Sequence, residues 1–139
     1  MDNNMKRKLN ELLKNNKSWP VIIEGGVKKE DFLSATVLPA TVPSASLGVI
    51  NDIGGLKMPD WVKSVEARKN SKANLLLIDG LDTVSEDEQL KFKGILDGKS
   101  LNGFKLPENM QIAILINDGN RAKINREILS LSLYYKVEE

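Results

Sequence analysis

Short apolar runs alternate along the chain with polar stretches in which apolar residues recur at helical spacing. The runs are rich in Val, Ile and Leu, and most of them close at Gly, Pro, Asn or Asp, which is typical of buried strands. They predict five strands, near residues 20–24, 35–38, 74–78, 111–116 and 132–137. Because strands that are apolar throughout need cover on both faces, we expect a three-layer α/β domain with a mainly parallel sheet.

Helical spacing predicts the elements that cover this sheet. In residues 3–16, Met5, Leu9 and Leu13 recur at that spacing among basic residues, which indicates an amphipathic N-terminal helix. Pro59 suits the first turn of a second helix, which carries a short apolar face.

Later segments are predicted in the same way. Ser85 and Glu88 match a capping box and open a helix over residues 85–96. Another short helix is expected over residues 125–131. Residues 39–59 contain three Pro and three Gly with almost no periodicity, so we expect a long loop there.

Composition narrows the class of protein. A chain of 139 residues with 41% hydrophobic side chains supports one domain, spanning residues 1–139, with a substantial core. Its net charge of +1 makes nucleic acid an unlikely partner. With no Cys and no His, thiolate or imidazole metal sites and His-based triads are excluded. No apolar run is long enough to span a membrane, and the N-terminus lacks a signal-peptide core, so we expect a cytoplasmic protein.

The central part of the chain resembles AAA+ ATPases of the MoxR-like kind. The resemblance rests on LLLIDGLD, on GKSLNGFKLPENMQIAILIND with its G-x-x-L-P-x-N phrase from Gly103 to Asn109, and on NDIGGLKMPDW. PVIIEGG is similar to a first strand leading into a phosphate loop, and INREILSLSLYYKVE to a last helix and strand. Over residues 19–138, this resemblance implies a P-loop NTPase fold with the AAA+ strand order, in which the last strand forms an edge.

The motif that would hold phosphates is degraded. A phosphate loop needs G-x-x-x-x-G-K-[ST], so that backbone N–H groups and a lysine surround the phosphates. Counting from Gly25 puts Glu30 at the second glycine and Asp31 at the lysine, and counting from Gly26 does no better. Lys28 and Lys29 remain as point charges. The positions that retain a vestige of the nucleotide site are Gly25, Gly26, Lys28, Lys29, Asp79 and Asn117.

The remaining family motifs are incomplete as well. By resemblance, Asp79 takes the Mg²⁺-binding position, but Gly80 replaces the glutamate that would polarise water. Asn117 takes the sensor position, although an Asn-Asp-Gly turn needs no chemistry. Leu131 stands where the arginine finger is expected, and the helical lid would be missing after Glu139. We therefore expect no catalytic residue, no ATP hydrolysis and no cofactor.

An acidic cluster offers a further candidate site, for a hard cation. Its members are Asp79, Asp82, Glu86, Asp87 and Glu88. Acids in a first helical turn also interact favourably with the helix dipole, which accounts for three of them, so we expect no metal site.

Three functions remain open. The first is an inactive AAA+-like module that binds a partner protein, such as an active AAA+ ATPase. The second is a weak NTPase or nucleotide sensor with a site rebuilt around Lys28, Lys29 and Asp79. The third is a nucleic-acid accessory protein that uses the basic N-terminal helix together with Arg121, Lys123 and Arg126. The near-neutral net charge disfavours this function.

Overall fold

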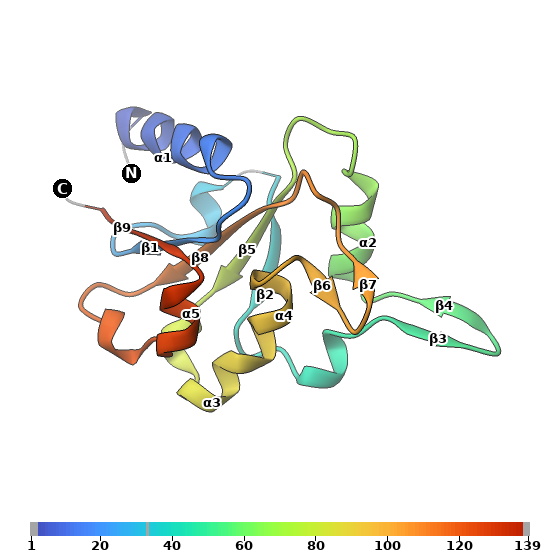
Figure 1. Ribbon diagram of the computed structural model, residues 1–139. Coiled ribbons are helices and arrows are strands. Elements are labelled where there is room, and N and C mark those ends of the chain that lie inside the picture. Colours follow the sequence, from blue (N-terminus) through green and yellow to red (C-terminus); the bar gives the residue numbers. More distant parts are fainter. Residues whose placement is uncertain (1–2, 33, 138–139) are drawn as a thin grey trace.

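The computed structural model describes residues 3–32 and 34–137, and its centre is one sheet of five parallel strands (Figure 1). Their order across the sheet is β2-β5-β8-β1-β9. Their bounds are β1 (Val21–Glu24), β2 (Thr36–Pro39), β5 (Leu75–Asp79), β8 (Gln111–Ile116) and β9 (Leu133–Lys136). All five predicted strands are confirmed within two residues at each end, and the last strand lies at an edge as expected.

Helices cover both faces of the sheet. On one face lies α1 (Asn3–Asn15), and on the other pack α2 (Asp60–Ala67), α4 (Lys93–Leu96) and α5 (Arg126–Ser130) (Figure 1). The three-layer α/β arrangement is therefore confirmed. No helix within residues 3–32 and 34–137 has the length and apolar character needed to cross a bilayer.

Alternate residues of each strand divide the core into two layers, because successive side chains of a strand point to opposite faces. Val21 and Ile23 meet Leu9 and Leu13 of α1 on one side. On the other side, Ile22 joins the larger apolar cluster under α2, α4 and α5. Full burial of side chains of this kind stabilises the fold by about 1.5–3 kcal/mol each.

The described residues of the connection from β1 to β2, 25–32 and 34–35, contain no α-helix. They include a 3₁₀ turn, Lys29–Asp31, and Phe32 is buried just after it. Residues 25–31 carry Gly-Gly and four charged side chains, so they have no apolar stripe from which a helix could dock. Instead α1, which precedes β1 in the chain, covers this face of the sheet.

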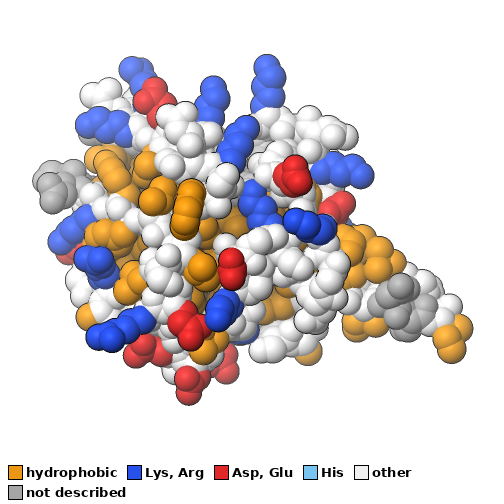
Figure 2. All heavy atoms as spheres, in the orientation of Figure 1, with side chains coloured by type: hydrophobic (Ala, Val, Ile, Leu, Met, Phe, Trp, Pro, Cys, Tyr) orange, Lys and Arg blue, Asp and Glu red, His pale blue; other side chains and the backbone are white. Residues whose placement is uncertain are grey.

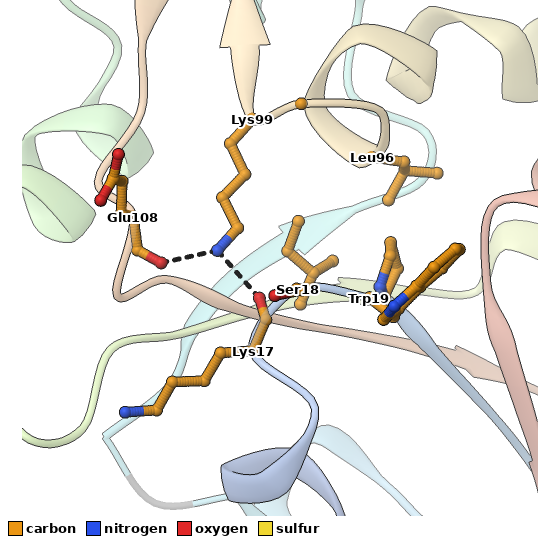
Figure 3. Close-up of a pocket in the computed structure, with 9 residues that line it drawn as sticks. Lys17, Ser18, Trp19, Leu96, Lys99 and Glu108 are labelled. Atoms are coloured by element: carbon orange, nitrogen blue, oxygen red, sulfur yellow. Dashed lines mark hydrogen bonds between the residues drawn. The ribbon is translucent and has the colours of Figure 1, made fainter.

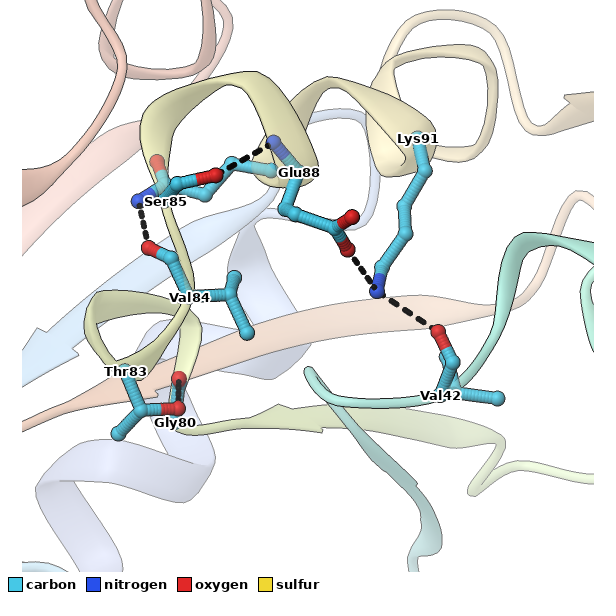
Figure 4. Close-up of polar contacts among 8 residues, drawn as sticks. Val42, Gly80, Thr83, Val84, Ser85, Glu88 and Lys91 are labelled. Carbon is cyan, nitrogen blue, oxygen red and sulfur yellow. Dashed lines mark hydrogen bonds and ion pairs between the residues drawn. The ribbon is translucent and has the colours of Figure 1, made fainter.

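The helix predicted over residues 85–96 begins as expected but is not continuous. Ser85 Oγ accepts the N–H of Glu88 at 3.2 Å, which caps α3 (Glu86–Gln89) (Figure 4). A 3₁₀ turn at Leu90–Phe92 then separates α3 from α4. Phe92 at the end of this turn and Ile95 of α4 are both fully buried.

The prediction of a long loop over residues 39–59 is wrong. The segment contains a 3₁₀ turn and a hairpin of β3 (Ile50–Asp52) and β4 (Gly55–Lys57), which projects from the body of the molecule (Figure 1). Gly55, at φ +98°, follows the two-residue turn. The Gly-Gly pair is a hairpin signal, but strands of three residues are too short to show periodicity.

A second hairpin joins α4 to β8. It pairs β6 (Ser100–Leu101) with β7 (Phe104–Lys105). Asn102 and Gly103 form its turn at φ +47° and +89°, as a two-residue hairpin loop with two positive φ angles requires.

Candidate functional site

The connections that leave the neighbouring strands β1 and β8 pass to opposite faces of the sheet. The connection after β1 supplies Phe32 to the α1 side, and the connection after β8 supplies Ile124 and Ile128 to the other side. In open α/β sheets, ligands bind beyond the carboxyl ends of the strands at such a switch point. The candidate site therefore lies between Glu24–Gly25 and residues 117–119.

Glu24 is the central buried acid of this edge, with 2% of its surface exposed. Its Oε1 accepts the Tyr134 hydroxyl proton at 2.7 Å, and its Oε2 accepts the N–H of Gly119 at 3.4 Å. Lys136 Nζ lies 3.7 Å from the same Oε2. The Tyr134 hydrogen bond lowers the pKa of Glu24 below its ordinary value, against the opposing effect of burial.

Two contacts hold Tyr134: its hydroxyl bonds to Glu24, and its ring packs under Arg121. Burial raises the pKa of Tyr134, and the hydrogen bond to Glu24 raises it further. The guanidinium of Arg121 lies over its ring, 4.5 Å from the ring centre, in cation–π geometry. The hydroxyl is thus kept as a proton donor to Glu24.

Asp82 is the second buried acid, with 6% exposed. Its Oδ2 accepts three hydrogen bonds: from the backbone N–H of Asn117 at 3.1 Å, from Asn117 Nδ2 at 3.1 Å, and from Asn120 Nδ2 at 2.7 Å. Its Oδ1 is buried and has no hydrogen-bond partner in the described part of the chain. The carboxylate therefore ties the turn after β5 to the turn after β8.

The sequence-predicted sensor residue, Asn117, is engaged by this contact. Its side-chain amide donates to Asp82 Oδ2 at 3.1 Å. The sequence predicts Asp82 only as one of five acids in a cluster. Within the described ranges, no three Asp or Glu side chains are close enough to hold a metal ion.

The predicted phosphate-loop positions follow β1 in a tight turn. Gly25 and Gly26 have φ of +84° and +61°, and a Cβ on Gly25 would lie 3.5 Å from the Asp118 side chain. Beyond them, the backbone N–H of Lys28 donates to Asp31 Oδ2 at 2.9 Å. A carboxylate thus accepts an N–H in the loop where a phosphate would lie, while the Lys28 and Lys29 side chains point to solvent.

Asp79 and Gly80 end β5 as the sequence predicts. Asp79 is half-buried, and no described residue bonds or pairs with its carboxylate. Gly80 has φ +80°, and a Cβ there would lie 3.4 Å from Thr83 Oγ1. Leu131, at the predicted finger position, is half-buried against the larger apolar cluster.

Sequence reasoning missed Tyr134, Asn120 and Lys136 as members of this edge. Glu24 and Lys136 are register partners in the β1–β9 pair. That pairing joins strands more than a hundred residues apart, so no local pattern signals it. No protein-family model matches the chain, and a comparison with curated proteins returns no match.

Proposed function

We propose that this chain is a catalytically inactive AAA+-like domain that binds a partner protein, such as an AAA+ ATPase, through the β3–β4 hairpin. The AAA+ part of the proposal is supported by the motifs over residues 19–138 and by a five-stranded parallel order with β9 at an edge. Three family positions, Asp79, Gly80 and Asn117, fall at the carboxyl ends of β5 and β8.

Inactivity is supported by the chemistry of that edge. Phosphoryl transfer depends on a cradle for the phosphates and on groups that position water. Here Asp31 accepts a loop N–H, Asp82 engages Asn117, and Glu24 is satisfied by Tyr134. A buried carboxylate at Glu24 would also repel a polyphosphate brought to the loop.

Exposed apolar side chains on the β3–β4 hairpin support the binding of a partner protein. Ile50, Ile53 and Leu56 are 55%, 108% and 50% exposed, although a two-stranded hairpin has no core of its own. Figure 2 shows hydrophobic side chains along the projecting arm. Cross-strand pairing places Ile50 opposite Lys57 and Leu56 opposite Asn51, so apolar residues occur on both faces. Apolar side chains exposed on both faces of a projecting arm support a role in binding a partner.

The base of the hairpin is anchored to the body. Lys91 Nζ donates to the carbonyl of Val42 at 2.7 Å and pairs with Glu88 at 3.2 Å (Figure 4). Trp61 Nε1 donates to the carbonyl of Ser46 at 3.3 Å. An arm fixed at its base presents its tip in a defined direction, which lowers the entropy cost of binding.

Site-specific photo-crosslinking in the native host tests the proposal. A photoreactive residue at Ile53 should trap one protein that also forms a stoichiometric complex with the purified chain. The same residue at Leu133, an apolar position of 37% exposure on β9, is the matched control. Substituting Ile53→Ser and Leu56→Ser should abolish the complex, whereas Leu133→Ser should leave it intact. A complex that survives the hairpin substitutions contradicts the proposed surface.

A further inference from the structure

A pocket of about 380 Å³ lies at the opposite edge of the sheet, next to the amino ends of β1 and β8. Its walls include Lys17, Trp19, Leu96, Lys99, Glu108 and Ile112. The volume is at the lower end of the range for small-molecule sites. Neither the carboxyl edge of the sheet nor the hairpin involves these residues.

Lys99 reaches across this pocket from the turn after α4 (Figure 3). Its Nζ donates to the carbonyl of Lys17 at 2.9 Å and to the carbonyl of Glu108 at 2.8 Å. An ammonium has three N–H donors, so one remains for a ligand. The Glu108 carboxylate points away from Nζ in Figure 3, and no described carboxylate lies within ion-pair distance of it.

Within the described residues, Lys99 therefore forms no ion pair. Burial lowers the pKa of Lys99, the nearby Lys105 and Lys17 lower it further, and Glu108 opposes them. A partly desolvated cation among other cations is costly unless an anion neutralises it. The local field favours a ligand with a negative group.

The other side of the pocket is apolar and flat. Trp19 is 52% exposed, although large aromatic side chains gain free energy from burial. Leu96 and Ile112 are buried beside it and form an apolar wall. No described residue accepts the Trp19 indole N–H. Figure 3 places Trp19 and Lys99 on opposite sides of the space.

We propose that this pocket binds a small organic anion whose carboxylate or similar group lies on Lys99 and whose flat apolar body stacks on Trp19. The negative group of the ligand pairs with the Lys99 ammonium, and its apolar body covers the exposed face of the Trp19 indole. Binding here is independent of the hairpin and of the carboxyl edge of the sheet.

Two matched probes test the chemistry directly. In ¹H–¹⁵N spectra of the full chain, 2-naphthoate should shift the Trp19 indole and Lys99 amide signals in a saturable way. The neutral isostere 2-naphthamide should bind at least roughly tenfold more weakly, because it lacks the charge. The Trp61 indole, which is buried and bonded to Ser46, should not move. Equal affinity for the two probes, or shifts centred elsewhere, overturns the proposal.

Variants separate the two halves of the site. Lys99→Met should weaken 2-naphthoate binding by roughly tenfold, while Lys99→Arg retains most of it. Trp19→Ala should weaken it by a similar factor, and Lys63→Met, an exposed change on α2, should have no effect. Inorganic phosphate alone should give no saturable shift, and phosphate binding as tight as that of 2-naphthoate contradicts the role of Trp19. If Lys99→Met does not fold, the probe pair on the parent chain still decides the question.

Discussion

The carboxyl edge of the sheet and the β3–β4 hairpin differ in which side chains they bury and which they expose. At the edge, polar groups are buried and bonded to one another, as Glu24 is to Tyr134 and Asp82 is to Asn117. On the hairpin, apolar groups such as Ile53 are left in solvent. Buried polar groups that are hydrogen-bonded to one another hold the fold rigid and have little to gain from a ligand. Exposed apolar side chains gain free energy when a partner removes them from water.

The comparison bears on function because the two regions offer a binding partner different surfaces. The edge holds the positions that resemble a nucleotide site, yet its side chains are engaged internally. The hairpin leaves Ile50, Ile53 and Leu56 exposed, because a two-stranded hairpin has no core of its own. Four changes test this contrast, beginning with the largest expected effect.

Removing the Asp82 carboxylate should be the most damaging change. Asp82→Ala leaves the Asn117 N–H and two side-chain amides without their shared acceptor, so unfolding free energy should fall by about 3 kcal/mol. Urea denaturation of the variant measures this loss. The exposed Asp97→Ala serves as the control and should change stability far less. A loss below that of the control would show that the two turns hold together without Asp82.

The Glu24–Tyr134 pair should make stability depend on pH. Because the folded-state pKa of Glu24 lies below the ordinary 4.5, its contribution is complete above that pH and is lost as pH falls through the folded pKa. Tyr134→Phe should cost about 1–3 kcal/mol near neutral pH and move the acid loss of stability to higher pH. Urea midpoints between acid and neutral pH measure both effects. Tyr135→Phe, on the opposite face of β9, should reproduce neither of them.

Restoring the missing acid should cost stability without creating an enzyme. Gly80→Glu places a side chain at φ +80°, so it should destabilise the fold by about 1–2 kcal/mol. Phosphate release should stay at background, since a glutamate helps only when a γ-phosphate and its water are in place. Gly80→Asn, which tolerates this backbone region better, is the control for strain. Turnover by Gly80→Glu or by the parent chain contradicts the inactive assignment.

The smallest effect is expected on the hairpin. Ile53→Ser should change unfolding free energy by less than about 0.5 kcal/mol, because the side chain is fully exposed at the turn. Thermal and urea unfolding measure this. A larger loss would mean that Ile53 supports the fold rather than a partner.

The strands and the cap at Ser85 could be predicted because their signals are local: apolar runs, turn residues and a three-residue spacing. The hairpin at residues 50–57 could not, since three-residue strands carry no period and only Gly54-Gly55 marks the turn. For the candidate site, the sequence placed Asp79 and Asn117 at strand ends. It could not place Tyr134 on Glu24, because that contact depends on β9 pairing with β1.

The most direct test of the central claim, that the carboxyl edge of the sheet is closed to nucleotide, is a site-resolved titration with MgATP. Amide signals of residues 25–31 and 117–120 report on that edge, and the Trp19 indole reports separately on the Lys99 pocket. The account predicts that the edge signals stay in place as the nucleotide is raised to millimolar concentration. Saturable movement of the Gly25, Gly26 and Asn117 amides would contradict it and would revive the nucleotide-sensor function.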